Sequence, residues 1–341
     1  MTKSICISGY YGFDNFGDEL ILKVLVENLK SFSFPTKITV FSSNPIKTSN
    51  NLGINSINSF DVFKLVNTII RSDCIISGGG SLLQDTTSAK SLIYYLFILG
   101  LAQLLRKKTI IFAQGIGPIN NKLLVRLTAF ILKQTKYITV RDDNSIKLLK
   151  DWGINANKCD DPVWNINIEK SEKKGKIGIQ LRNCKIITNK FISELAININ
   201  KYYSNKELYI LSLQNSYDLN ICNKLKYELE KINKSLNIKI IENSSNENII
   251  KEIIQLEELI AMRYHACLIA IKAGVKLLPI NYDIKVENLG KEFNLIEINP
   301  REINEIGKIF EEYQNKNIIQ NSDIIKNKAY NFKELEKQIL N

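Results

Sequence analysis

Short apolar, β-branched runs alternate with longer segments of helical periodicity along nearly the whole chain. Apolar runs of this kind are typical of buried parallel strands. In the first half, the pattern predicts strands at 3–10, 37–43, 74–77, 109–114 and 137–140, and helices at 19–30, 60–70, 92–105, 122–133 and 145–152. A strand followed by a helix, repeated, predicts right-handed βαβ units in a doubly wound sheet.

The alternation breaks at residues 160–176, where Asp-Asp-Pro-Val-Trp precedes a lysine-rich polar stretch that is typical of a linker. A second series follows, with predicted strands at 177–182, 208–213, 238–242, 259–262, 276–281 and 295–299. We therefore predict an α/β protein in which two Rossmann-like, doubly wound domains face a central cleft. The predicted boundaries are 1–165, 175–320 and a helical C-terminal tail at 321–341.

The composition is that of a globular protein, with 341 residues of which 45% are hydrophobic and 24% charged. The net charge is +11, but the lysines are dispersed and no basic-aromatic recognition module appears, so nucleic acid is not the expected partner. Anionic small molecules and anionic lipid remain open as partners. The cysteines are dispersed without a C-x-x-C pair, and the N-terminus runs directly into a strand without a signal peptide, so we expect a cytoplasmic location.

One strongly apolar stretch, 92–105, is followed by Arg106, Lys107 and Lys108. It falls short of the roughly 20 residues that a membrane-spanning helix needs. It fits a buried helix of an α/β layer. It also fits a peripheral surface that touches the inner face of the plasma membrane, with the basic cluster toward the headgroups, or the interface of a homo-oligomer.

In open α/β sheets, ligands bind beyond the carboxyl ends of the strands, so the loops that follow strands are the candidates for chemistry. The loop after the first strand reads GYYGFDNFGDE, and its glycines let backbone amides approach a ligand. Asp18 and Glu19 are either helix-capping carboxylates or, for Asp18, a general base, with Asp14 as the other candidate base and Asn15 beside it. The loop after the third predicted strand holds Gly78, Gly79 and Gly80, a nest of amides suited to an anion or a sugar.

Two further strands of the first half end in polar side chains. Gln114 comes at the end of the fourth strand, in a loop that resembles a shaped wall, and can hydrogen-bond a substrate. Arg141 ends the next strand, where it can clamp a carboxylate or phosphate. Its alternative role is a salt bridge to Asp142 or Asp143.

The second half has one junction rich in chemistry, where a strand ends at Arg263 and a small apolar helix opens near His265. An anion binds well at the positive end of a helix, and the neighbouring arginine strengthens that site. His265 is the only histidine, which excludes His-cluster zinc sites. A last loop offers Tyr282 and Lys285 together with a carboxylate. We expect no metal site.

Together these segments resemble the polysaccharide pyruvyl transferase family, and more closely its cell-surface-anchoring (CsaB) branch. The resemblance runs from residue 9 to residue 286 through GYYGFDNFGDE, SGGGSLLQD, AQGIGP, VRDDNS, DDPVW, MRYHACLIA and NYDIKV. The chain departs from the family pattern at Asp14, Tyr264 and Ile284, so Asp14 is not carried over as a family residue.

The resemblance implies a GT-B-like fold and the transfer of pyruvate from phosphoenolpyruvate to a sugar as a ketal. In this branch the acceptor is typically a lipid-linked precursor of a wall polymer. The family's phosphoenolpyruvate contacts map onto Arg263, Tyr264 and His265, with Arg141 as a further arginine. The enol carbon must gain a proton, for which His265 is the natural acid, and the sugar hydroxyls need a base, for which Asp18 is the first candidate. Phosphoenolpyruvate is then a co-substrate, and no cofactor is needed.

Two other functions fit the same domains. A glycosyltransferase that uses a nucleotide sugar would have the same pair of Rossmann-like domains, and a thermal-shift comparison of donors would separate the two. A non-catalytic sugar-binding protein would have lost the reactive groups, whereas Arg263, His265, Arg141 and Asp18 are all present.

Overall fold

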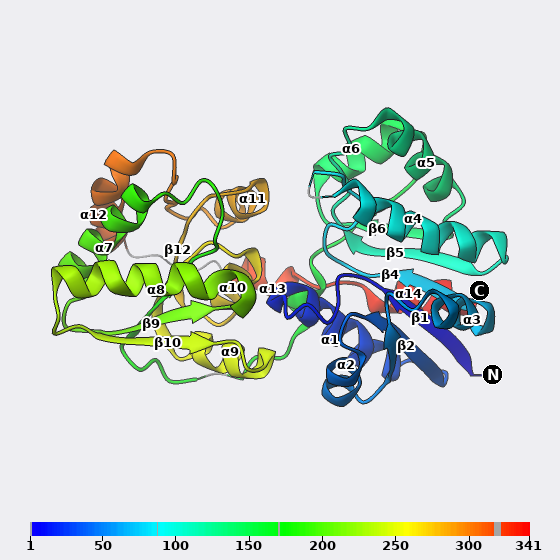
Figure 1. Cartoon of the computed structure of the whole chain (residues 1–341), viewed down its shortest axis with the longest axis horizontal. Coiled ribbons are helices and arrows are strands. Elements are labelled where there is room, and N and C mark those ends of the chain that lie inside the picture. The colour runs from blue at the N-terminus through cyan, green and yellow to red at the C-terminus, as the bar shows by residue number, and fades with distance from the viewer. Residues whose placement is uncertain (1, 87, 170, 317–321) are drawn as a thin grey trace. The chain divides into compact units, whose positions relative to one another are not determined.

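The computed structural model describes residues 2–86, 88–169, 171–316 and 322–341. The chain divides into two compact units (Figure 1). The first unit comprises Met1–Ile166 together with Lys328–Asn341, and the second comprises Asn167–Asn327. Each unit is an α/β layer structure built on a parallel sheet.

The sheet of the first unit has the strand order β3-β2-β1-β4-β5-β6-β7, and every neighbouring pair is parallel. Its apolar central strands are buried on both faces, as the continuous apolar runs predict. The strands are β1 (Lys3–Ser8), β2 (Thr36–Ser42), β3 (Asn55–Asn58), β4 (Cys74–Ser77), β5 (Lys108–Gln114), β6 (Tyr137–Val140) and β7 (Asn157–Lys158).

The helices of the first unit begin at polar caps and connect successive strands. Asn15, Ser88 and Asn121 each accept a hydrogen bond from the first turn of the helix that follows. The helices are α1 (Phe16–Lys30), α2 (Pro45–Leu52), α3 (Val62–Arg71), α4 (Ala89–Leu104), α5 (Lys122–Lys133) and α6 (Asp143–Asp151), with a short 3-10 helix η1 (Pro162–Asn165). The strands and helices predicted for this half are confirmed, and α2, β3 and β7 were not predicted.

The C-terminal residues do not form a separate tail. Helix α14 (Phe332–Leu340) belongs to the first unit, which the chain re-enters at Lys328. Lys328 pairs with Asp160 at 2.9 Å, and the rings of Tyr330 and Phe332 pack on Phe112. The sequence predicted a separate tail because this segment is mostly polar. Its contacts with the first unit come from a few apolar side chains, such as Tyr330 and Phe332.

The second unit carries a parallel sheet with the strand order β10-β9-β8-β11-β12. The strands are β8 (Lys176–Gln180), β9 (Glu207–Ser212), β10 (Asn237–Glu242), β11 (Leu256–Ala261) and β12 (Lys276–Pro279). The helices are α7 (Asn189–Tyr203), α8 (Asn215–Ile232), α9 (Asn246–Ile254), α10 (Tyr264–Lys272), α11 (Ile284–Glu292), α12 (Ile306–Asn315) and α13 (Ser322–Asn327), with a 3-10 helix η2 (Ile303–Glu305).

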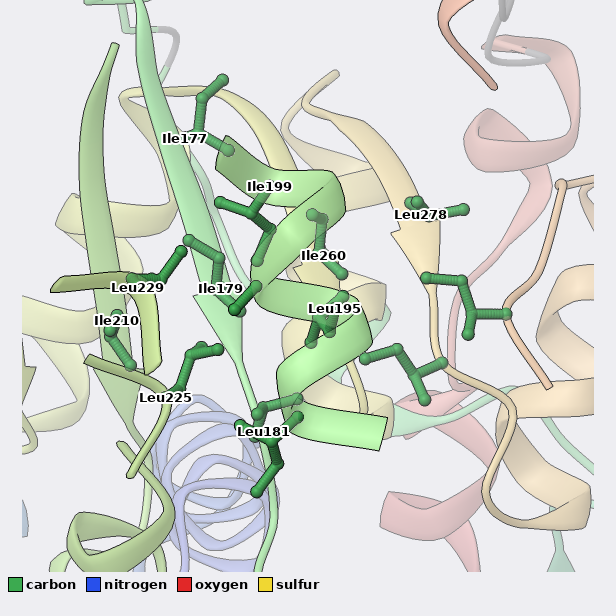
Figure 2. Close-up of a cluster of buried hydrophobic side chains, with 14 of the residues drawn as sticks. Ile177, Ile179, Leu181, Leu195, Ile199, Ile210, Leu225, Leu229, Ile260 and Leu278 are labelled. Atoms are coloured by element: carbon green, nitrogen blue, oxygen red, sulfur yellow. The ribbon is translucent and has the colours of Figure 1, made fainter. Parts of the chain in front are cut away.

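The core of the second unit lies between α7 and the sheet. Figure 2 shows Leu195 and Ile199 of α7 among buried side chains of the strands, including Ile179 of β8 and Ile260 of β11. The strand predicted at 295–299 is wrong. Ile296 and Ile298 alternate inward and are buried, but only an isolated bridge between Ile298 and Ile280 pairs this segment with the sheet.

Both sheets reverse their strand order at one place. In the first unit the chain moves from β1 outward to β3 and then crosses to β4, on the other side of β1. In the second unit β8 and β11 are related in the same way. Ligands of open α/β sheets bind at such switch points, beyond the carboxyl ends of the two strands. The loops after β1, β4, β8 and β11 are therefore the places where the fold favours a site.

Candidate functional site

The loop after β1 wraps around the side chain of Glu19. Its carboxylate accepts a hydrogen bond from the backbone N–H of Gly12 at 2.7 Å. Gly12 has a φ of 80°, and a Cβ there would meet the backbone of Ser43 and Asn44, so only glycine fits the turn. Burial raises the pKa of Glu19 to about 7, against the hydrogen bond from Gly12 and with a further contribution from the charge of Asp18.

Two candidates of this loop have structural partners. Asp14 is half-exposed and pairs with Lys47, with 2.7 Å between the carboxylate and the ammonium. Asn15 caps α1, and its side-chain oxygen accepts from the N–H of Gly17 at 3.3 Å. Asp14 thus ties the loop to Lys47 of α2, and Asn15 ties it to the start of α1.

The three glycines after β4 pack closely against the loop after β1. A Cβ on Gly78 would overlap the phenol of Tyr11, and one on Gly80 would lie 2.6 Å from Oδ1 of Asp18. The hydroxyl of Tyr11 is buried and has no hydrogen-bond partner among the described residues. Burial holds the pKa of Tyr11 well above its usual range, and the charges of Asp18 and Glu19 raise it further. Asp18 therefore lies beside residues 78–80, which we call the glycine loop.

Gln114 and Arg141 both donate hydrogen bonds to backbone carbonyls of the glycine loop. Gln114 is fully buried, and its amide donates to Ser77 Oγ and to the carbonyl of Gly78, each at 2.7 Å. Arg141 donates to the carbonyl of Gly80 at 3.0 Å and pairs with buried Asp161. The alternative role of Arg141 was a salt bridge to Asp142 or Asp143, and the structure gives it an ion pair with Asp161 of the DDPVW segment. Both side chains support the loop, and their predicted role as direct ligands of a substrate gains no support from these contacts.

In the second unit, the end of β11 is tied to the end of β8. The side-chain oxygen of Gln180 accepts from the N–H of Arg263 at 2.7 Å. The backbone N–H of Arg182 lies 3.1 Å from the sulfur of Met262. Arg182 and Arg263 thus leave neighbouring strands at the switch point of this sheet.

The guanidinium of Arg263 is held by a buried carboxylate. Nε and Nη2 donate to the two oxygens of Asp218 at 2.9 and 2.8 Å, and Nη2 lies 3.3 Å from Gln214 Oε1. Asp218 is fully buried. The sequence pointed to Arg263 as a contact for an anion, and in the structure Asp218 compensates its charge. Among the described residues, Nη1 is the terminal nitrogen of Arg263 that makes no hydrogen bond.

His265 stands in the first turn of α10, directly after Arg263. Arg263 is the N-cap residue and makes no side-chain hydrogen bond to the helix, whereas Asp283 caps α11 with two. The rings of Tyr264 and His265 meet edge to face, with 5.1 Å between their centroids. The positive end of α10, with His265 in its first turn, therefore lies at the sheet edge from which Arg263 leaves β11.

Tyr282 closes this group from the end of β12. Its hydroxyl lies 3.2 Å from a guanidinium nitrogen of Arg182. Burial raises the pKa of Tyr282 to about 12 and the charge of Asp283 raises it too, while Arg182 and Arg263 both lower it. Both arginines thus act on one phenol. Lys285 lies next to it in the first turn of α11, where its N–H donates to Asp283.

Sequence reasoning missed three members of these sites. Arg182 ends a predicted strand, as Arg141 does, and this signal could have found it. Asp218 lies 45 residues before its partner Arg263, and nothing in the local pattern joins them. Glu19 was considered only as a capping carboxylate. Over the described parts of the chain, no three His, Cys, Asp or Glu side chains gather as metal ligands would.

Solved structures with a similar fold are sugar-nucleotide epimerases and glycosyltransferases. The UDP-GlcNAc 2-epimerase of Neisseria meningitidis bound to UDP-GlcNAc matches with a TM-score of 0.61 and 12% identity over 100% of both chains. The UDP-GlcNAc 2-epimerase of Methanocaldococcus jannaschii has a TM-score of 0.63 and 14% identity, covering 93% of this chain and 94% of that one. The lipopolysaccharide outer core galactosyltransferase WaaB, in its apo form, has a TM-score of 0.57 and 13% identity over 99% of both chains.

These likenesses establish the fold, which is GT-B-like with two Rossmann-like domains. No curated protein matches the sequence. The family model for polysaccharide pyruvyl transferases matches residues 15–284, which include every candidate residue except Asp14 and Lys285. The resemblance seen in the motifs is confirmed at the level of the family, and the chain belongs to the polysaccharide pyruvyl transferase family.

Proposed function

We propose that this transferase moves pyruvate from phosphoenolpyruvate onto two hydroxyls of a sugar in a cell-surface polysaccharide precursor, forming a ketal and releasing phosphate. The family supports the transfer of pyruvate. The observation that carries the choice of donor is the pair of arginines beside His265 at the switch point of the second unit. Phosphoenolpyruvate has a phosphate and a carboxylate, and this edge offers a guanidinium for each, although Asp218 compensates the charge of Arg263.

The donor binds through Arg182, Nη1 of Arg263 and the N-terminal turn of α10 in this proposal. Asp218 fixes the guanidinium plane of Arg263, so the arginine does not need to be ordered when the donor arrives. Arg182 is exposed and provides a positive charge that adds to the hydrogen-bond donors of Arg263. A helix N-terminus adds backbone donors and a partial positive charge for phosphate oxygens. Tyr264 and Tyr282 form the walls, with Lys285 at the rim.

His265 protonates the methylene carbon of phosphoenolpyruvate. Protonation at that carbon turns it into a methyl group and makes the neighbouring carbon electrophilic. One sugar hydroxyl adds to that carbon, phosphate leaves, and the second hydroxyl adds. Of the two hydroxyl protons, one replaces the proton that His265 gave and the other leaves with phosphate, so the reaction balances without water.

Asp18 is the base in this proposal, and the first unit carries the acceptor. Asp14, the second candidate, is paired with Lys47, whereas Asp18 lies against Gly80 in the loop that suits a sugar. Asn15 has its side-chain oxygen in the cap of α1. In this proposal the amide nitrogen of Asn15 and the backbone of Gly79 contact the acceptor. Gly78, Gln114 and Arg141 act through the shape of the loop.

The acceptor belongs, in this proposal, to the class that the cell-surface-anchoring branch uses, a lipid-linked wall-polymer precursor. The reaction then takes place on the cytoplasmic side of the membrane, which the free state of all six cysteines supports. Phosphoenolpyruvate serves as co-substrate, without a further cofactor.

The test is phosphate release from phosphoenolpyruvate with a panel of sugar acceptors, followed by mass spectrometry of the product. We expect acceptor-dependent release and a product that carries one pyruvate ketal. His265→Gln should lose turnover by about 10²–10⁴-fold while the fold and the affinity for phosphoenolpyruvate are kept. Transfer of a sugar from a UDP- or GDP-sugar, without pyruvylation of any acceptor, would replace the proposal by a glycosyltransferase.

A further inference from the structure

The first unit exposes large apolar side chains on three successive helices. Phe63 of α3 is 91% exposed, Phe97 and Leu104 of α4 are 47% and 80% exposed, and Phe130 of α5 is 63% exposed. The remaining exposed apolar residues of this set are Phe60, Val62, Ile70, Ile93, Leu123 and Leu127. We call these residues together the α3–α5 face. Isolated exposed apolar residues are normal, whereas a group on adjacent helices marks a surface that meets something.

The three helices lie side by side on one face of the sheet. Helix α3 connects β3 to β4, α4 connects β4 to β5, and α5 connects β5 to β6, all in the same direction along the sheet. Because such crossovers are right-handed, the three helices lie on the same face of the sheet. Buried residues of α3 and α4 share one cluster with the strands, and those of α4 and α5 share another. On α4, Ile93, Phe97 and Leu104 fall on the outward stripe, while Leu92, Leu96 and Leu99 point inward. The apolar stretch 92–105 is therefore a packed helix with an apolar outer side.

All formal charges on these helices are positive. Helices α3, α4 and α5 contain no Asp or Glu, and their exposed cations are Lys64, Arg71, Lys90, Lys122, Arg126 and Lys133, with Arg106 just after α4. By contrast, helix α8 of the second unit carries charges of both signs, because Glu228 and Glu230 stand among its lysines. Two carboxylates stand at the ends of these helices: Asp61 caps α3 and pairs with Lys64 at 3.1 Å, and Asp85 accepts from the backbone N–H groups of Asn120 and Asn121 before α5. The cations still outnumber them. Apolar side chains among mostly positive charges indicate a partner that is apolar inside and anionic at its surface.

We propose that the α3–α5 face binds the surface of an anionic lipid bilayer. Phenylalanine and leucine side chains enter the boundary between headgroups and acyl chains, and lysine and arginine remain at the phosphates. A second copy of this chain is a poor occupant, because it would bring two predominantly cationic surfaces together. No helix within the described residues is long and apolar enough to cross a membrane, so the contact is one of surface binding.

The position of this face gives it a consequence for the reaction. Helices α4 and α5 begin just after the loops at the carboxyl ends of β4 and β5, so their N-terminal ends lie at the edge that carries the glycine loop. Binding of the bilayer does not depend on the proposed reaction. If the proposed function holds, the same contact brings the glycine loop near a lipid-borne acceptor.

The experiment is flotation of the purified full chain with vesicles of phosphatidylcholine alone or mixed with phosphatidylglycerol. Phe97→Ser/Phe130→Ser removes two exposed rings, and Ile197→Ser/Tyr227→Ser, exposed on helices of the second unit, is the matched control. Arg126→Gln/Lys133→Gln removes charge, with Lys224→Gln/Lys226→Gln as its control. All of these positions are at the surface, and circular dichroism checks that each variant folds.

We expect the wild-type chain to float with the anionic vesicles, and the double ring variant to lose about tenfold or more in partition coefficient. The charge variant should lose affinity for anionic vesicles only, and its remaining binding should be less sensitive to salt. Both controls should float like the wild type. Wild-type protein that does not float would overturn the proposal, as would ring variants that bind undiminished. A concentration-dependent dimer that the ring variants abolish, without lipid binding, would assign the face to a second copy instead. Each of these outcomes can be read without any pyruvyl transfer assay.

Discussion

Arg182 and Arg263 are neighbours at one sheet edge, yet they differ in what holds their charge. Arg263 is buried and bound through two nitrogens to Asp218, which is itself fully buried. Arg182 is exposed and contacts the phenol of Tyr282. Removing one partner of a buried ion pair strands the other charge, whereas removing an exposed charge does not.

Arg263→Ala should therefore lower the free energy of unfolding by about 3–5 kcal/mol. Arg182→Ala should change it by less than about 1 kcal/mol and instead raise the KM for phosphoenolpyruvate. Urea denaturation and steady-state kinetics of both variants check this pair. Equal stability of the two variants would contradict a stabilising ion pair between Arg263 and Asp218.

Glu19 gives the loop after β1 a pH dependence. The folded chain holds this proton up to about pH 7, whereas an ordinary glutamate side chain releases it near pH 4.5. The folded state thus binds more protons between these values, and the free energy of unfolding falls as the pH rises through this window. The loss reaches up to about 3 kcal/mol above pH 7.

Glu19→Gln keeps an acceptor for the N–H of Gly12 and removes the buried charge. We expect the variant to be more stable than wild type at pH 8 and equally stable at pH 4.5, as measured by denaturation across this range. Glu27→Gln, an exposed position on the same helix that pairs with Lys23, is the control and should show no such trend. A wild-type advantage at pH 8 would contradict the raised pKa.

At the residue scale, sequence reasoning named candidate residues but not their partners. Arg263, His265 and Asp18 were proposed because each lies in the segment between the end of a strand and the first turn of the next helix, and that place is visible in the apolar pattern. The contacts of Arg141 with Asp161 and of Arg263 with Asp218 join segments that only the folded sheet brings together. Gln114 was predicted to contact a substrate because its burial is not visible in the local sequence. That burial comes from β4 and β6, which flank β5 in the sheet.

At the scale of elements, the return of the C-terminus stabilises the first unit. Phe332 packs on Phe112 and Tyr330, with ring centroids 5.8 and 4.8 Å away, and the carbonyl of Ile339 accepts from Lys108. Helix α14 thereby covers the central strand β5.

Phe332→Ala should cost the first unit about 3 kcal/mol or more, because it opens a cavity over Phe112. Phe130→Ala, which truncates an exposed ring of the same unit, should cost less than about 0.5 kcal/mol. Hydrogen exchange locates the effect: the amides of β5 and β6 should lose protection in the first variant, while those of the second unit keep it. Loss of protection in the second unit alone would place α14 there.

The apolar period predicted most of the elements because strands buried on both faces leave a continuous run. Helix α2 and strand β3 were missed because their sequences are largely polar and only partly buried. The segment 295–299 shows the opposite error, since its alternation of buried Ile296 and Ile298 resembles a strand, whereas it meets the sheet only through the isolated bridge between Ile298 and Ile280. Pairing is a property of the neighbours in the sheet, which local periodicity does not contain.

At the scale of the whole molecule, each unit has one switch point, and the chemistry is divided between them. The first unit combines a glycine loop with carboxyl groups, and the second combines arginines with the histidine. The family model spans both edges. The central claim is that phosphoenolpyruvate binds beside His265 and receives its proton.

His265 is the only histidine, so selective isotope labelling gives a single imidazole signal in an NMR spectrum. Titration with phosphoenolpyruvate should shift that signal to saturation, and Arg182→Gln should weaken the titration while leaving the starting signal in place. A UDP-sugar should leave the signal unmoved. An imidazole signal that saturating phosphoenolpyruvate does not move, but a nucleotide sugar does, would contradict the assignment of this site to the donor.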